Sequence, residues 1–459
     1  MLRHAVALML VGCDDKPPTT DSTDTESTDT DTDTGEPGTT PPEPLVLDGL
    51  TYRLDPQLET LVYVGWNQSL PATVHVEYAV DPGEWRSTPA VAYEAGTHER
   101  LVVGIPFDED AEWRVVADDG TTADGELVVT GAIPDGIPSA TVTVSEPDGW
   151  LPSEFLLMSI NARANGWAGG AYWTLIIDRQ GRVVWAHRAP DEAWTLFAQV
   201  GVEGDRILWD EQRYWSDFYS EGAYSKVHAT WLDGEIEVID TPGLHHAFVQ
   251  LPDGTLAWGS QAHGGREALV EKAPGETEVV LWTCEDDWPG SGSCESNGLF
   301  YQPSSNTFLY SFYTNSSIVE IDRATGTSLW WAGGMDDGYT FAEPDDQFYW
   351  QHGISWTPSG TLLMSADNND DTKLMEFEVD KDQQQLTLVF SSPSGLVAGT
   401  NGQAWRLTNG NTLHLVGAGG LVREVDPAGA EVWVVDFGYN HLIGHGQLLP
   451  DLYALVAPD

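Results

Sequence analysis

The chain has 459 residues. A single hydrophobic core seldom extends over so many residues, and the length is sufficient for two folded regions. Its 72 Asp and Glu outnumber 20 Lys and Arg, and the net charge of -52 argues against a nucleic-acid-binding surface. The 20 Trp, 47 Gly and 27 Pro point to an all-β protein with many turns, and three Cys are too few for a disulfide scaffold.

The first residues have the pattern of a bacterial export signal. Arg3 gives a basic start, a short apolar run follows, and the run ends in Leu-Val-Gly before Cys13. This ending resembles the lipobox of bacterial lipoproteins, whose cysteine is lipidated and becomes the new N-terminus. We therefore expect a lipoprotein signal peptide at 1–12 and a lipid anchor at Cys13, which would hold the exported protein at the cell envelope, in the periplasm or on the outer surface. The alternative is an ordinary buried N-terminal segment.

Residues 13–44 form a low-complexity segment, rich in Asp, Thr, Ser, Glu, Pro and Gly. Such a segment has no apolar surface to bury, and its carboxylates repel one another, so it stays solvated and extended. We expect a disordered tether. Because an acidic chain is repelled by anionic lipids, any contact with a membrane would come only through the lipid at Cys13.

Residues 45–140 alternate apolar and polar side chains in short runs. Examples are LVYVGW (61–66), ATVHVEYAV (72–80) and EWRVVA (112–117), separated by turn-rich segments. This alternation predicts a small antiparallel β-sandwich, similar to an immunoglobulin or fibronectin type III module. The region contains no cluster of His, Cys or paired acids that would mark a site.

From residue 141 to 459 the sequence repeats two short units. The first reads apolar-x-apolar-Asp-x-x-Gly-x-apolar-apolar-Trp, in IIDRQGRVVW (176–185), EIDRATGTSLWW (320–331) and EVDPAGAEVWVV (424–435). It predicts a β-hairpin that turns at the Gly and carries a packing Trp on its second strand. The second unit centres on Pro-Asp/Ser-Gly-x-Leu, and its first positions fall at 196, 246, 297, 352 and 402. A period of roughly 50 residues is typical of repeat architectures.

Two hairpins per repeat make a four-stranded sheet, and a ring of such sheets is a β-propeller. Residues 444–456 look like a further copy of the second unit, and 171–185 is a first unit without its predecessor. These two segments would join into one sheet and close the ring. We therefore expect an all-β protein in which a β-sandwich at 45–140 precedes a six-bladed β-propeller at 141–459.

Two cysteines remain if Cys13 carries lipid. Cys284 and Cys294 flank a loop rich in Gly, Pro and Ser, and export would place them in an oxidising compartment. We expect a disulfide between them, with two free buried thiols as the alternative.

The first position of each second unit should face the central funnel, because equivalent positions in a repeat lie at the same depth. These positions hold Leu196, His246, Asn297, His352, Gly402 and, with a one-residue slip, His445. A single histidine is more often a hydrogen-bonded structural residue than a catalytic one. Several histidines converging on one axis, however, indicate a functional site.

Four segments together resemble the bacterial arylsulfotransferases. They are HHAFVQLPDGTL (245–256), ESNGLFY (295–301) with the following DRATGTSLWWAGG, FYWQHGISWTPSGTLLMSADN (348–368) and LLPDLYAL (448–455). The resemblance spans essentially the whole ordered chain. It implies a six-bladed propeller preceded by a small β domain. It also implies transfer of a sulfuryl group from a phenolic sulfate ester to a phenol, through a sulfated histidine and without the nucleotide sulfate donor.

By position, the resemblance makes His352 the nucleophile and His246 a sulfate-binding residue or acid. The candidates for the rest of the substrate site are His245, Glu295, Asn297, Tyr313, His445, Lys373 and Arg266. Two of these depart from the family. The family usually has a histidine where Glu295 stands and an arginine where Tyr313 stands, and both missing groups would bind the sulfuryl oxygens. Lys373 and Arg266 are the candidates to replace the lost arginine, although Lys lacks its planar fork.

Two other functions stay open. The first is a propeller that has lost sulfuryl transfer and serves as a cell-surface binding or assembly module, which Glu295 and Tyr313 favour. The second is a quinone-cofactor dehydrogenase, suggested by DRATGTSLWW (322–331) but ranked last because such proteins commonly have eight blades. We expect no cofactor and no metal site. The acidic loops at 336–346 and 367–371 offer Ca²⁺ ligands, but solvated loop acids are the commoner case.

Overall fold

The computed structural model describes residues 43–164, 171–191, 193–212, 225–263, 267–289, 294–367 and 371–458. The expected signal peptide, Cys13, most of the tether and Arg266 lie outside these residues. Residues Leu45–Asp459 form one compact unit. Its described elements are almost all strands, which confirms the expected all-β class. No helix in the described part of the chain is long and apolar enough to cross a membrane.

Residues 47–129 form two antiparallel sheets that share one core. The first sheet has the order β1 (Leu47–Leu54), β2 (Val62–Gln68), β6 (Gly96–Val102). The second contains β3 (Ala72–Ala79), β4 (Arg86–Ser87), β5 (Val91–Tyr93), β7 (Asp110–Ala117), β8 (Thr122–Asp124) and β9 (Val128–Val129). Burial alternates along β2 and β7, so that Val64, Trp66, Trp113 and Val115 turn into the common core. The alternating pattern in the sequence therefore predicted these strands correctly.

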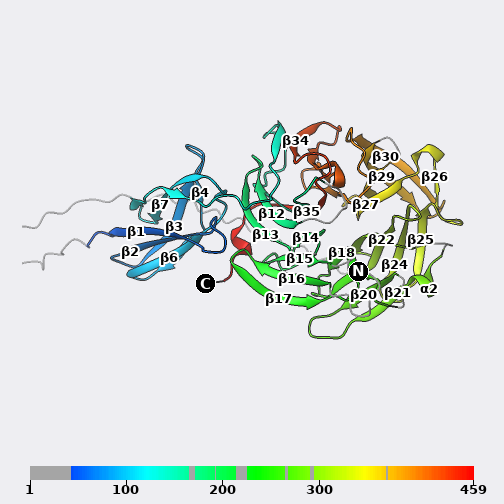
Figure 1. The fold of residues 1–459 in the computed structure, drawn as a ribbon, viewed down its shortest axis with the longest axis horizontal. Helices are drawn as coiled ribbons and strands as arrows, with labels where there is room; N and C mark the ends of the chain where they lie inside the picture. Colours follow the sequence, from blue (N-terminus) through cyan, green and yellow to red (C-terminus); the bar gives the residue numbers. More distant parts are fainter. Residues whose placement is uncertain are drawn as a thin grey trace, which may run out of the picture. The chain divides into compact units, whose positions relative to one another are not determined.

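The remaining strands form six sheets that follow one another in chain order (Figure 1). Sheet 1 contains β11 (Phe155–Asn161), β12 (Tyr172–Asp178), β13 (Val183–Arg188) and β35 (Ile443–Leu449). Sheet 2 contains β14 (Ala198–Val200), β15 (Ile207–Glu211), β16 (Lys226–Trp231) and β17 (Gly234–Asp240). Sheet 3 contains β18 (Leu244–Gln250), β19 (Leu256–Ser260), β20 (Ala268–Lys272) and β21 (Val279–Thr283).

Sheet 4 contains β22 (Ser296–Gln302), β23 (Thr307–Phe312), β24 (Ser317–Asp322) and β25 (Ser328–Gly333). Sheet 5 contains β26 (Thr340–Phe341), β27 (Tyr349–Trp356), β28 (Leu362–Asp367), β29 (Thr372–Asp380) and β30 (Gln385–Pro393). Sheet 6 contains β10 (Thr141–Ser145), β31 (Gln403–Arg406), β32 (Thr412–Leu415), β33 (Leu421–Val425) and β34 (Glu431–Asp436). The short helices are α2 (Cys284–Asp287) and the 3₁₀ turns η1 (Pro344–Asp346), η2 (Gly417–Gly419) and η3 (Tyr453–Leu455).

The repeated units form the hairpins that the sequence predicts. The first unit gives the outer hairpins β12–β13, β24–β25 and β33–β34. Each of these turns at a glycine with positive φ (Gly181, Gly326 and Gly429), and the preceding Asp side chain accepts backbone N–H groups of the turn. The second unit gives the inner hairpins, such as β18–β19 and β27–β28. The predicted union of the two chain ends is also present, because β35 pairs with β11 in sheet 1.

Hydrogen bonds link each sheet to the next near the first strand of the inner hairpin, and the links close into a circle. They join His445 to Leu196, His246 to Gln212, Ser296 to Glu267, Asn297 to Gln351, Asn401 to His352, and Gly446 to Gln403. Sheets in this closed order make a β-propeller fold. Residues at the starts of the inner strands are therefore brought to one region.

The expected disulfide is confirmed. Cys284 begins α2 and is bridged to Cys294, which lies ten positions later in the chain. Both cysteines are buried and pack in the largest apolar cluster of the propeller, together with Trp282 and Phe312. The bridge therefore joins the end of sheet 3 to the beginning of sheet 4.

Candidate functional site

The inner strands of sheets 3, 4 and 5 are irregular where the candidate residues lie. Pairing slips between Leu244 and Phe248 in β18, between Ser296 and Gly298 in β22, and on both sides of His352 in β27. His246 also has a φ of +61°, which is uncommon for a residue with a side chain. Bulges re-aim side chains and are frequent beside active sites. The slips thus leave His245 and His246 outside the regular ladder and place His352, which pairs with Ser365, between two irregularities.

His246 is surrounded by other candidates. Its imidazole ring centre lies 6.1 Å from that of Tyr313, and its Nδ1 lies 2.8 Å from Nδ1 of His245. Its backbone N–H donates to Oε1 of Gln212 at 2.8 Å. Burial, then repulsion by His245 and His352, holds the pKa of His246 well below its ordinary value. The structure thus places His352 within electrostatic reach of His246, and it makes the imidazole of His246 neutral at pH 7.

His352 is held by two backbone groups. Its Nδ1 lies 2.8 Å from the carbonyl oxygen of Trp350, and its Nε2 accepts the N–H of Asn401 at 3.0 Å. Nδ1 therefore carries the proton and Nε2 the lone pair. Burial lowers the pKa of His352 to about 4, against the opposing effect of the Trp350 carbonyl. In the neutral ring, Nε2 carries the lone pair that nucleophilic attack needs. This lone pair accepts the Asn401 amide, so a substrate would have to displace that hydrogen bond.

Glu295 and Tyr313 contact each other. The hydroxyl of Tyr313 donates to Oε2 of Glu295 at 2.5 Å, and the Tyr313 N–H donates to the Glu295 carbonyl at 3.2 Å. Tyr313 thus satisfies one oxygen of the Glu295 carboxylate. Neither residue carries a positive charge, so the pair itself offers no cation to an anionic ligand.

Two other predicted residues are engaged elsewhere, and a third, Lys373, is on another strand. Asn297 uses its side-chain amide inside the protein, because Nδ2 donates to the Gln351 carbonyl at 2.7 Å and Oδ1 accepts from Ser311 at 2.7 Å. His445 lies between Gln403 and the Ala198 carbonyl, which occupy both ring nitrogens. Lys373 is on β29, with β28 between it and His352, and within the described residues no hydrogen bond or ion pair joins it to either histidine.

Sequence reasoning missed Glu267, the residue that organises the double-histidine strand. Glu267 immediately precedes β20 and is fully buried. Its Oε2 lies 2.7 Å from Nε2 of His245, and its Oε1 accepts the hydroxyls of Ser296 and Tyr310. The only signal in the sequence is an acid placed directly before a buried strand, and it does not reveal which neighbours that acid would meet.

The described residues contain no group of three or more His, Cys, Asp or Glu placed to hold a metal ion. The acidic loop at 336–346 is therefore without such a group, while residues 368–370 of the second acidic loop lie outside the described chain.

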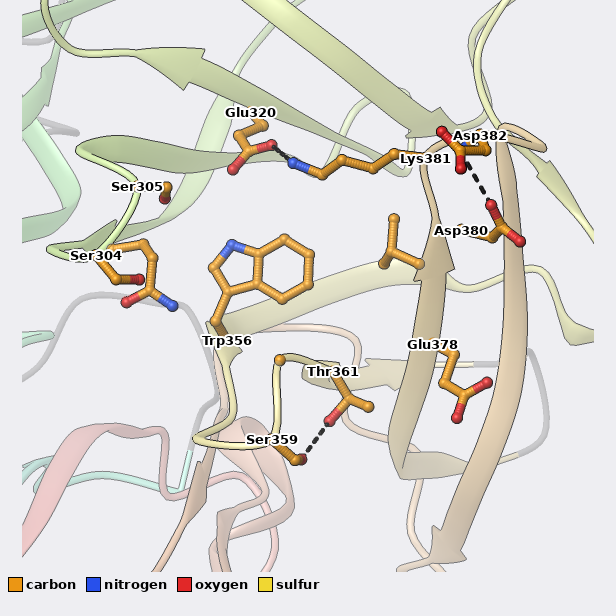
Figure 2. A pocket seen from close by; sticks show the side chains of 13 residues that line it. Ser304, Ser305, Glu320, Trp356, Ser359, Thr361, Glu378, Asp380, Lys381 and Asp382 are labelled. Carbon is orange, nitrogen blue, oxygen red and sulfur yellow. Dashed lines mark hydrogen bonds and ion pairs between the residues drawn. The ribbon is translucent and has the colours of Figure 1, made fainter. Parts of the chain in front are cut away.

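A separate pocket of about 680 Å³ lies at the other end of the inner strands, between sheets 4 and 5. Figure 2 shows the Trp356 indole in this pocket and Lys381 reaching across to Glu320, with an Nζ–Oε2 distance of 2.8 Å. Trp356 ends β27, four residues after His352. The pocket is thus distinct from the histidine site, and its ion pair is internally satisfied.

No protein-family model and no curated protein matches the chain. Among solved structures, similarity was found to a protein of unknown function from Bacteroides caccae, with a TM-score of 0.41 and 15% identity over 61% of this chain and 93% of that one. The β-propeller domain of Cps50 (Swd1) from Myceliophteria thermophila has a TM-score of 0.38 and 15% identity, over 66% and 88%. Regucalcin from Agrobacterium tumefaciens, a calcium-binding protein, has a TM-score of 0.35 and 14% identity, over 52% and 73%. Likenesses at this level carry no argument about function.

Proposed function

We propose that this chain is an arylsulfotransferase-like enzyme that moves a sulfuryl group from a phenolic sulfate ester to a phenol. In this proposal the six sheets are the six blades of the propeller, and the sheets at 47–129 are an immunoglobulin-like module before it. The observation that carries the proposal is the pair of buried, neutral imidazoles, His246 and His352, which lie within electrostatic reach of each other on bulged strands. A neutral imidazole is the form that acts as nucleophile or base.

The chemistry follows from the tautomer of His352. Nε2 gives its lone pair to sulfur while the bond from sulfur to the aryl oxygen breaks, and the phenolate leaves with that electron pair. A phenol oxygen then takes the sulfuryl group from the nitrogen and loses its proton, and the lone pair returns to Nε2. His246, whose pKa is lowered by His352, is the candidate to accept the proton that the phenol loses.

The test is turnover of a chromogenic phenyl sulfate with phenol as the acceptor. His352→Ala should lose all measurable turnover, because the nucleophile is gone, whereas His246→Ala should lose roughly 10²–10³ in rate, within the usual range for removing a general acid or base. Mass spectrometry of the quenched wild type should show one sulfuryl group on His352. The control is His75→Ala on β3, a histidine of the N-terminal sheets, which should retain wild-type turnover.

A binding or assembly module is the second candidate, and two contacts favour it. Glu295 and Tyr313 hydrogen-bond to each other, and the Asn401 amide donates to the lone pair of His352. Absence of turnover in the wild type, together with an unmodified His352 after incubation with aryl sulfate, would contradict the enzyme and leave this candidate.

A further inference from the structure

The buried acid beside the double-histidine strand has an unusual set of neighbours. Glu267 receives hydrogen bonds from Ser296 and Tyr310, both of which carry hydroxyl donors, and its other oxygen faces Nε2 of His245 at 2.7 Å. Within the described residues its only ion-pair partner is His245. Because hydroxyl donors already point at the carboxylate, Glu267 acts as the acceptor and Nε2 of His245 carries a proton.

The contact between Glu267 and His245 determines which ring nitrogen of His246 carries a proton. With Nε2–H of His245 directed at Glu267, a neutral His245 has its lone pair on Nδ1, which lies 2.8 Å from Nδ1 of His246. A hydrogen bond between these two nitrogens needs one proton, which then sits on Nδ1 of His246. The lone pair of a neutral His246 is consequently on Nε2, the nitrogen that faces away from His245.

We propose that Glu267, His245 and His246 form a proton relay that serves the acceptor half of the reaction. This inference rests on the proposed function. The proton of the acceptor phenol passes to Nε2 of His246, and the proton on Nδ1 of His246 passes to Nδ1 of His245. The phenol oxygen keeps its electron pair and bonds to sulfur, while the bond between sulfur and Nε2 of His352 breaks and returns its pair to nitrogen. The positive charge ends on His245, beside the carboxylate of Glu267.

The relay accounts for how a strongly buried imidazole accepts a proton. A charge that stayed on His246 would be desolvated and repelled by His352, which is why the pKa of His246 is well below its ordinary value. Moving the charge one ring further places it 2.7 Å from a carboxylate oxygen. The other titratable groups around the relay are Tyr310 at Glu267, the Tyr313–Glu295 pair beside His246, and Asp210, which contacts Gln212.

Glu267→Gln is the informative change, because it should change which ring nitrogens of His245 and His246 carry protons while hardly changing the shape of the side chain at 267. The new amide can donate to Nε2 of His245, which would move the proton of that ring to Nδ1 and the proton of His246 to Nε2. In ¹⁵N-histidine NMR of the full chain, with His245→Gln and His246→Gln for assignment, both rings should change tautomer. The matched control is Glu271→Gln, four residues later on the same segment, where the carboxylate pairs with Arg323.

Kinetics of the same variant distinguish a relay from a structural contact. Glu267→Gln should slow transfer to a weakly acidic phenol roughly 10²-fold, the lower range for general base catalysis. The loss should shrink to less than about threefold for an acidic phenol that is already ionised, because no proton then needs removal. Formation of sulfated His352, measured as the first burst of product, should remain within about threefold of the wild type, since that half does not use the relay.

The outcomes separate this proposal from the proposed function. The relay would be overturned if NMR of the wild type showed that His245 is not in the Nε2–H form. It would also be overturned if Glu267→Gln slowed transfer equally to both phenols. Neither result would contradict sulfuryl transfer itself. The expected tautomers in a wild type without any turnover would support the proton arrangement and contradict the sulfotransferase. If Glu267→Gln does not fold, His245→Gln gives the same comparison of phenols, because it interrupts the relay and leaves Glu267 in place.

Discussion

His445 illustrates why a histidine in the expected position need not be a site residue. Its Nε2 lies 2.7 Å from Nε2 of Gln403, its Nδ1 faces the Ala198 carbonyl at 3.3 Å, and its ring stacks on Phe197. Burial lowers its pKa to about 4. The unfolded chain would bind a proton there near pH 6.5. Between these two values the unfolded state holds more protons, so the folded state loses stability as the pH falls.

We expect His445→Gln to reduce this acid sensitivity. The glutamine amide offers one acceptor and one donor to the same partners but does not titrate. Between pH 7 and pH 4.5, the variant should lose roughly 2–3 kcal/mol less free energy of unfolding than the wild type. Urea unfolding at the two pH values measures this difference. His98→Gln in the N-terminal sheets is the control, and an unchanged pH dependence in His445→Gln would show that the ring is protonated in the folded state.

At the scale of the strand, the bulge in β27 depends on a glycine next to His352. Gly353 has a φ of +53°, and a Cβ on it would lie 2.3 Å from Cα of Gln403 in the neighbouring sheet. The strand that carries His352 is thus in backbone contact with β31. This close approach fixes the depth at which the imidazole meets the Asn401 amide.

Gly353→Ala should therefore destabilise the protein by roughly 2–4 kcal/mol, the sum of a disfavoured backbone conformation and a clash between two backbones. Gly360 is the matched control, because its φ of +85° is also positive but a Cβ added there would meet no heavy atom within 4 Å. Gly360→Ala should cost only about 1 kcal/mol. Chemical denaturation compares the two, and equal losses would mean that β27 and β31 move apart without resistance.

The same strands show what the sequence could and could not predict. Repeated Asp-x-x-Gly turns and buried Trp residues identified the hairpins, and the period placed His246 and His352 in equivalent positions. The partner of β35 was not identified, because β11 is a uniformly buried strand without the repeat motif. Glu267 and Asn401 were also missed. Both act across sheets, and such contacts depend on bulges that leave no regular mark in the sequence.

At the scale of the whole molecule, the net charge of -52 opposes the substrate of the proposed reaction. An aryl sulfate is an anion, and the field of an acidic protein lowers its concentration near the surface. The neutral imidazoles of the site do not reverse this field locally. The global repulsion should therefore be visible in how salt changes the capture of the donor.

We expect kcat/KM for the aryl sulfate to rise severalfold when sodium chloride is raised from about 0.01 M to 0.1 M, because the screening length falls from about 30 Å to about 10 Å. The KM for a neutral phenol acceptor is the internal control and should stay constant, since an uncharged molecule does not respond to the field. Initial rates at low donor concentration give the measurement. A fall in kcat/KM with salt would show instead that local cations attract the donor, and Arg266 and Lys373 would then be the residues to replace, because a missing cation should abolish that salt dependence.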